Sequence, residues 1–163
     1  MFIFGIDPGL NNTGVGILKV SDNKLLYHNH AVIKTKSNNT LPQRLKKICT
    51  DIQALIDEYS PKYAAIEDIF YSVNIKSAIL LGQTRGAIIA TILNNDIEIL
   101  EFTALQIKKS VVGYGKADKQ QVKKLVELHL AKTFDKKIPL DATDALACGI
   151  CLGLNLTGKY NVI

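Results

Sequence analysis

The segment FIFGID, residues 2–7, most limits the folds open to this chain, because it is an apolar run of strand length that ends in a carboxylate. Pro8 and Gly9 follow Asp7 directly and start a sharp turn. A buried strand that delivers Asp7 to its own end has two interpretations. Asp7 is a turn former, or it is held on a rigid strand end to bind a metal ion.

The order of apolar patterns after this segment indicates an α/β fold. Strands at 2–7, 14–20 and 25–34, joined by short turns, predict an antiparallel meander. Later periodicities predict strands over 63–70 and 97–104, helices over 41–59, 77–94, 119–131 and 141–155, and a short helix over 105–113. We expect the element order β-β-β-α-β-α-β-α-α and a mixed five-stranded sheet with helices on both faces.

Length and composition fit one globular domain, with 163 residues, 47% apolar and 21% charged. We expect this domain to span 1–157 and residues 158–163 to form a short C-terminal tail. No run of about 18 apolar residues occurs and the N-terminus does not resemble a signal peptide, so we expect no membrane segment and a cytoplasmic protein. Cys49, Cys148 and Cys151 are expected to be free thiols rather than zinc or redox groups.

Basic residues gather in one stretch of the chain. The net charge is +5, and residues 106–124 hold six lysines and one acid, Asp118. Such a stretch is either a solvated basic surface or a binding site for a polyanion. The lysines are Lys108, Lys109, Lys116, Lys119, Lys123 and Lys124.

Two further places hold carboxylates that call for explanation. Glu67 lies inside the apolar segment AAIEDIF, where an unpaired charge is costly to bury. Asp141 and Asp144 are three residues apart at a helix start and therefore share one face. Each has a structural alternative, because Glu67 can pair with a lysine, and acids are favoured in the first turn of a helix.

Taken together, these carboxylates favour a metal site. If the first and fourth strands are neighbours, Asp7 and Glu67 lie side by side, and a helix start that crosses them adds Asp141 and Asp144. Four carboxylates so close repel one another strongly. Mg²⁺ or Mn²⁺ relieves the repulsion by accepting their oxygens, and two such ions about 3.5–4 Å apart form the two-metal site of nucleases.

The predicted helix 77–94 is apolar almost all round, which is typical of a buried helix. Ala78, Gly82, Gly86 and Ala90 form a ridge of small residues at i, i+4 spacing, so another backbone should come close. That neighbour is either the sheet or a partner subunit.

The chain resembles the RuvC family of bacterial Holliday junction resolvases over nearly its whole length. The matching stretches are GIDPGLNNTG (5–14), AIEDIFYSVNIKSAILLGQTRG (65–86), VVGYGKADKQQV (111–122) and DATDALA (141–147). The resemblance implies the ribonuclease H-like fold, with Asp7, Glu67, Asp141 and Asp144 as the catalytic acids that bind Mg²⁺. Thr143 stands where alanine is usual and Asp68 where a neutral residue is common.

The resemblance also implies which residues meet DNA. Lys108 and Lys119 match lysines that face DNA, and we expect Lys116 in the same stretch to bind phosphate. Phe70 matches an aromatic residue near the exchange point of the junction, where it can stack on an unpaired base. Asn74, Ser77 and Arg85 match family positions. Asn74 and Ser77 are expected to contact phosphates, although Ser77 fits a helix N-cap equally well.

The function implied is Mg²⁺-dependent, symmetric cleavage of four-way DNA junctions in recombination and repair, by a homodimer that works beside RuvA and RuvB. Two Mg²⁺ ions per active site are expected, with Mn²⁺ as a substitute. Alternatives are an actin-like ATPase or sugar kinase, a RuvC-like protein of ribosomal RNA processing, and a junction-binding protein without activity. The first needs two domains, the second lacks the DATDALA spacing, and the four acids argue against the third.

Overall fold

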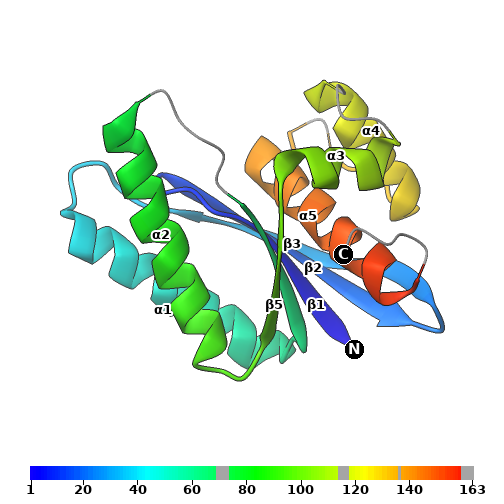
Figure 1. Cartoon of the computed structure of the whole chain (residues 1–163), viewed down its shortest axis with the longest axis horizontal. Coiled ribbons are helices and arrows are strands. Elements are labelled where there is room, and N and C mark those ends of the chain that lie inside the picture. Colours follow the sequence, from blue (N-terminus) through cyan, green and yellow to red (C-terminus); the bar gives the residue numbers. More distant parts are fainter. Residues whose placement is uncertain (69–73, 114–117, 136, 159–163) are drawn as a thin grey trace.

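The computed structural model describes residues 1–68, 74–113, 118–135 and 137–158, and the side chain of Lys119 also lies outside the description. Five strands form one sheet in the order β3-β2-β1-β4-β5 (Figure 1). The strands are β1 Phe2–Asp7, β2 Asn12–Ser21, β3 Lys24–Lys34, β4 Tyr63–Glu67 and β5 Glu98–Phe102. The described residues form the helices α1 Leu41–Tyr59, α2 Ile75–Leu93, α3 Ala104–Val112, α4 Lys119–His129 and α5 Leu140–Leu156.

The sheet is mixed, as the sequence predicts. β1, β2 and β3 pair antiparallel, whereas β4 pairs parallel to β1 and β5 parallel to β4. Asp22 and Asn23 connect β2 to β3 with φ of 50° and 56°, a left-handed conformation that asparagine and aspartate tolerate in tight hairpin turns. The antiparallel meander at the start of the chain is therefore confirmed.

Helices cover both faces of the sheet (Figure 1). One core lies between the sheet and α1 and α2, and includes Phe4, Ile6, Ile52 and Ile88. The other lies between the sheet and α3, α4 and α5, and includes Ile3, Ala65, Val126 and Leu146. Neighbouring residues of β1 alternate between the two cores, since side chains of a strand point to opposite faces.

Several elements end at residues other than those predicted. β4 stops at Glu67 rather than at residue 70, and β5 stops at Phe102, where Thr103 caps α3. Ser77 is not an N-cap, because α2 begins at Ile75 and Asn74 Oδ1 accepts from the Ser77 amide at 3.2 Å. In the described residues three helices follow β5: α3, which was predicted as the short helix over 105–113, and then α4 and α5, although the expected order of elements contains only two.

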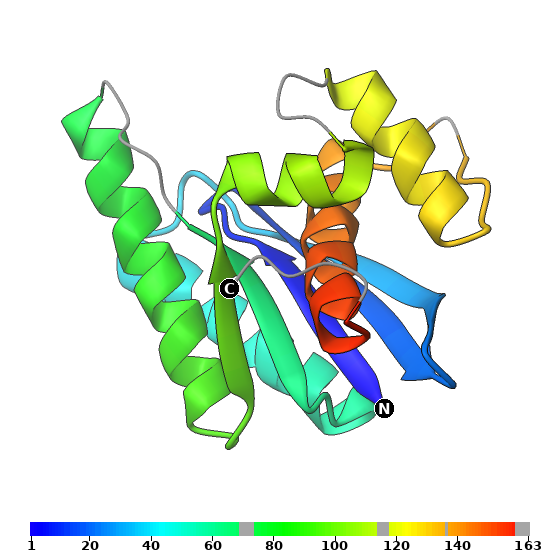
Figure 2. The ribbon, with the colours of Figure 1, turned by 45° about the vertical axis from the view of Figure 1, so that its right-hand side comes forward.

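The topology brings three strand ends to one edge of the sheet. β1, β4 and β5 run parallel, so their carboxyl ends meet there. Figure 2 shows α3, α4 and the start of α5 gathered at this edge. In open α/β sheets, this edge is where sites are commonly built. No helix within the described ranges combines the length and the apolar character needed to cross a membrane.

Candidate active site

Asp7 and Glu67 are the last residues of two neighbouring parallel strands. Ile6 lies beside Ile66 in the register of β1 and β4, so Asp7 and Glu67 lie beside each other as well. Alternation along the strands puts both side chains on the face covered by α5, and both are half-buried. This is the side-by-side arrangement that the sequence predicts for these two residues.

The first turn of α5 lies directly on the strand next to Asp7. Gly14 is the register partner of Asp7, and a side-chain carbon at Gly14 would collide with the backbone carbonyl of Asp141. Gly5 is in similar contact with the backbone of Ala145 and Gly149. Glycine permits this close approach because it has no Cβ. Sequence reasoning missed the role of Gly14, although a glycine inside a strand is itself a signal of close backbone approach.

A pocket of about 240 Å³ opens beside Glu67 and Asp144. Lys108 of α3 also lines it, so two acidic residues and one basic residue line the described pocket. Its other lining residues are Ala104, Ile107, Val122 and Ala147. The pocket therefore draws on β4, α3, α4 and α5, which are far apart in the sequence.

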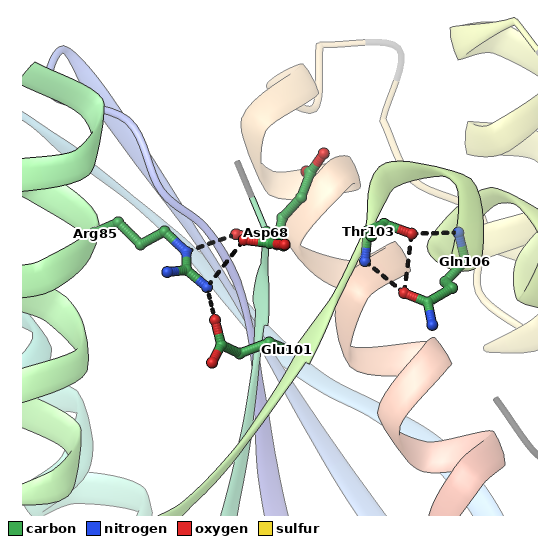
Figure 3. Close-up of polar contacts among 6 residues, drawn as sticks. Asp68, Arg85, Glu101, Thr103 and Gln106 are labelled. Atoms are coloured by element: carbon green, nitrogen blue, oxygen red, sulfur yellow. Dashed lines mark hydrogen bonds and ion pairs between the residues drawn. The ribbon is translucent and has the colours of Figure 1, made fainter. Parts of the chain in front are cut away.

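A reciprocal cap fixes the start of α3, and with it the approach of Lys108. The Thr103 amide donates to Gln106 Oε1 at 2.8 Å, and the Gln106 amide donates to Thr103 Oγ1 at 3.2 Å (Figure 3). This capping box satisfies amides that a helix start leaves without intrahelical partners. Thr103 directly follows the last residue of β5, so α3 begins at the strand ends without an intervening loop. This places Lys108 of α3 beside the pocket.

α5 itself carries two cysteines, Cys148 and Cys151, and the Cys148 thiol responds to two of the carboxylates. Burial raises the pKa of the Cys148 thiol well above its ordinary value, and the charges of Cys151, Glu67 and Asp7 raise it further against a hydrogen bond with the Ile6 backbone. Burial also raises the pKa of Cys151 to about 11, against a hydrogen bond with Ser110. Asp7 and Glu67 thus both act, more weakly than burial, on the same buried thiol of α5.

The carboxylates are close in backbone position but do not form a ready-made metal cage. Asp7, Glu67, Asp141 and Asp144 are all half-buried around the start of α5. Among the residues that the structure describes, no group of three or more His, Cys, Asp or Glu side chains is arranged to hold a metal ion. The donor set nevertheless fits a hard divalent cation, because every candidate ligand is a carboxylate oxygen.

The other predicted residues divide into three groups. Asn74 and Ser77 are exposed at the start of α2, where Asn74 is the N-cap, and neither is among the described residues that line the pocket. Lys119 is the first residue of α4, three positions before the lining residue Val122. Phe70 and Lys116 lie outside the described residues.

Asp68 points away from the pocket, as alternation predicts. Its side chain is half exposed and lies 3.6 Å from the Arg85 guanidinium (Figure 3). Glu67 and Asp68 therefore serve opposite faces of the sheet, and only Glu67 faces the pocket.

Comparison with known proteins agrees with this geometry. The family model "Crossover junction endodeoxyribonuclease RuvC" matches residues 3–152. Proteins of that name from Ralstonia pickettii and Acinetobacter baylyi are 44% and 46% identical over 151 and 149 residues. They cover 93% and 91% of this chain, and this chain covers 82% and 81% of theirs.

A solved structure has the same fold. Thermus thermophilus RuvC in complex with a Holliday junction substrate gives a TM-score of 0.89 at 23% identity, covering 98% of this chain and 96% of that one. The ribonuclease H-like arrangement expected from the sequence is therefore confirmed. On the family match and the identity to its curated members, the chain belongs to the RuvC family of crossover junction endodeoxyribonucleases.

Proposed function

We propose that this protein resolves four-way DNA junctions by paired, symmetric cuts, in recombination and repair. Family membership supports an endonuclease of this kind, and a relative of the same fold was solved with a Holliday junction. The observation that carries the proposal is the pairing of Asp7 with Glu67 at adjacent strand ends, beneath the helix start that bears Asp141 and Asp144.

RuvC enzymes are metal-dependent nucleases, and we assign the metal site to these four carboxylates. Asp7 and Glu67 would hold the ions from the sheet, and Asp141 and Asp144 from the first turns of α5. We expect Mg²⁺, two ions per active site, with Mn²⁺ as a substitute, since carboxylate oxygens suit both. When bound, the ions supply Lewis-acid activation and neutralise charge on the phosphodiester during hydrolysis.

The protein's own groups bind and orient the DNA around this centre. Lys108 lines the same pocket as Glu67 and Asp144, and we expect its ammonium group to neutralise a phosphate oxygen next to the cleaved bond. We expect Lys116 and Lys119 to bind neighbouring phosphates, Asn74 and Ser77 to bind phosphates at the start of α2, and Phe70 to stack on an unpaired base. Hydrolysis by in-line attack of water leaves 5′-phosphate and 3′-hydroxyl ends.

We further propose a homodimer that forms through the outer stripe of α2, defined as Ile75, Ile79, Gly82, Gly86, Ala90 and Leu93. All six residues are exposed and lie on one helix face, opposite the buried Thr84, Ile88 and Ile92. Ile75, Ile79 and Leu93 are 76%, 56% and 54% exposed.

The small residues of the stripe favour a second copy over the sheet as their neighbour. A Cβ added at Gly82 or Gly86 meets nothing within 4 Å, so this ridge faces away from the sheet. An apolar, self-complementary stripe suits a two-fold interface. A four-way junction is itself two-fold symmetric, and paired cuts need two active sites.

The cellular setting follows from the substrate. We propose that the enzyme acts in the cytoplasm, on junctions processed by RuvA and RuvB, as one nuclease domain over 1–157 with a short tail. Residues 159–163 of that tail lie outside the described part of the chain.

A cleavage assay tests the proposal. End-labelled synthetic four-way junctions and linear duplexes of matched sequence are incubated with the protein while Mg²⁺ is titrated from zero. We expect Mg²⁺-dependent cutting of the junction in pairs, with products that ligase can reseal, and little cutting of the duplex. Asp7→Asn should abolish cutting and keep junction binding in EDTA, whereas Asp51→Asn, a surface acid on α1, should cut normally. Wild-type cutting by Asp7→Asn would refute the assignment.

A further inference from the structure

The chain contains very little arginine. Of its 20 lysine and arginine residues, only Arg44 and Arg85 are arginines. A guanidinium holds five donors in a fixed planar fork and can bond several acceptors at once, whereas the ammonium group of lysine is a compact point charge. In a chain that otherwise uses lysine, an arginine is therefore expected where several acceptors surround a single side chain.

Arg85 holds the end of the strand that carries Glu67. Its Nε donates to the Glu67 backbone carbonyl at 3.1 Å, and its Nη2 forms an ion pair with Glu101 of β5 and lies 3.6 Å from Asp68 (Figure 3). The side chain of Arg85 is only 14% exposed. A single guanidinium thus ties the ends of β4 and β5 to α2.

Arg44 does the same for the turn that follows Asp7. From α1, its Nη2 donates to the Leu10 carbonyl at 3.1 Å and to Asn11 Oδ1 at 2.5 Å, and its Nε donates to Thr35 Oγ1 at 2.8 Å. Thr35 completes the network, because its hydroxyl donates to the Leu10 carbonyl at 2.6 Å and its amide to the Asn11 carbonyl at 3.0 Å. The turn between β1 and β2 is thereby fixed to the end of β3.

The two arginines share one geometry. Both come from α1 and α2, the helices on the face of the sheet opposite α5, and neither is among the described residues that line the pocket. Each donates to a main-chain carbonyl at or just beyond the end of a strand that bears a proposed metal ligand. We propose that Arg44 and Arg85 are positioning residues that fix the ends of β1 and β4 from behind the sheet, so that the carboxylates of Asp7 and Glu67 keep the separation a metal site needs.

The inference rests on the proposed metal role of Asp7 and Glu67. Its physical basis is that a hydrogen bond to a charged donor is stronger than a neutral one. Loss of an outer group that orients a ligand typically lowers metal affinity or activity by about 10–100-fold. Substitution of either arginine by lysine keeps the positive charge. Lysine lacks the planar guanidinium, however, and its ammonium group cannot bond all the acceptors that the arginine bonds at once.

The experiment compares Arg85→Lys and Arg44→Lys with the wild type in three measurements: Mn²⁺ affinity by calorimetry without DNA, junction affinity in EDTA, and the thermal unfolding midpoint. We expect Mn²⁺ affinity to fall by about 10–100-fold, with junction affinity unchanged and the protein folded. Lys47→Met is the matched control, because it removes only the exposed surface pair with Asp51 on α1, and it should leave Mn²⁺ affinity unchanged.

A second variant covers the case in which Arg85→Lys does not fold. Glu101→Gln leaves Arg85 in place but removes its acidic partner, and it should lower Mn²⁺ affinity in the same direction by less. Hydrogen exchange adds a local readout, since the Asp68 amide donates to the Phe102 carbonyl at 2.8 Å. In Arg85→Lys that amide should exchange faster, while the Ala65 amide in the middle of β4 should not.

The outcomes separate the two proposals. Folded Arg44→Lys and Arg85→Lys proteins with wild-type Mn²⁺ affinity and wild-type exchange at Asp68 would overturn the positioning role. Glu67→Gln with wild-type Mn²⁺ affinity would instead overturn the metal site. In that case the exchange rate at Asp68 still decides whether Arg85 anchors the end of β4.

Discussion

Substitution of Gly14 by alanine should separate the start of α5 from the sheet. A Cβ at this position would collide with the Asp141 carbonyl oxygen and would lie 2.6 Å from the Asp141 carbonyl carbon and 3.1 Å from Ala145 Cβ. The first two contacts are with main-chain atoms, which cannot move aside by changing a rotamer. The helix must therefore shift, and Asp141 and Asp144 must shift with it.

The loss in the free energy of unfolding can be estimated from other overpacked sites, where an inserted group typically costs about 1–3 kcal/mol of stability. Because Gly14→Ala creates a collision with main-chain atoms, we expect a loss at the upper end of this range. Alanine offsets about 0.4–1 kcal/mol of it, since it lowers the conformational entropy of the unfolded chain. The net loss is about 2–2.6 kcal/mol, which corresponds to a fall of roughly 4–10 °C in the unfolding midpoint for a chain of this length. Cleavage should fall on the order of 10²-fold, as is seen when reacting groups are displaced by about 1 Å.

Gly16→Ala is the graded control on the same strand. A Cβ there would lie 2.9 Å from the backbone nitrogen and Cα of Leu146 and 3.0 Å from its Cδ2. Since these contacts are milder and lie further along α5, we expect a midpoint shift below about 4 °C and a smaller loss of cleavage. Thermal unfolding by circular dichroism and junction cleavage, at a temperature where every variant is folded, measure both quantities. A Gly14→Ala protein with wild-type stability and cleavage would refute the close contact between α5 and β2.

Three further predictions concern the interface, the buried thiols and the DNA contacts. We expect sedimentation at micromolar concentration to show a dimer for the wild type and a monomer for Ile79→Asp. Leu26→Asp, at an exposed position on β3, should remain a dimer. A monomeric wild type would contradict the interface. Burial raises the pKa of Cys151 from 9.0 to about 11, so its contribution to stability is complete below pH 9 and is lost as the pH rises toward 11. The unfolding midpoint of the wild type should therefore fall more steeply over that range than that of Cys151→Ala, and equal slopes would count against the shift. Junction affinity in EDTA should fall steeply with salt, and Lys108→Gln should reduce the logarithmic slope by about 1; an unchanged slope would remove Lys108 from the DNA contact.

The neighbourhood of Asp7 and Glu67 could be predicted from the sequence because strand signals are local. FIFGID and YAAIE are short apolar runs with a carboxylate at a defined position. Once the two strands are neighbours, alternation fixes the faces of both acids. The return of the last helix start to the same edge did not follow from these strand signals; it was a condition of the metal-site hypothesis, and the resemblance to the RuvC family supported it.

The misplaced boundaries depended on contacts that a sequence pattern does not contain. The apolar residues after Glu67 favoured a strand to residue 70, whereas β4 pairs only as far as Phe102 of β5, after which Thr103 turns the chain into α3. Asn74 and Ser77 are both good caps, and the sequence pattern does not decide which of them begins α2. The role of Arg44 could not be predicted, because its partners Leu10 and Thr35 lie in separate segments that only the fold brings together, although the scarcity of arginine is visible in the composition.

The central claim is that Asp7, Glu67, Asp141 and Asp144 converge on bound metal ions, and anomalous diffraction from crystals soaked in Mn²⁺ tests it most directly. The account predicts anomalous density between the ends of β1 and β4 and the first turn of α5, with carboxylate oxygens of Asp7 and Glu67 as ligands. That density should be lost in Asp7→Asn crystals. Density at a different place, or none between these strands in a protein that cleaves junctions with Mn²⁺, would contradict the claim.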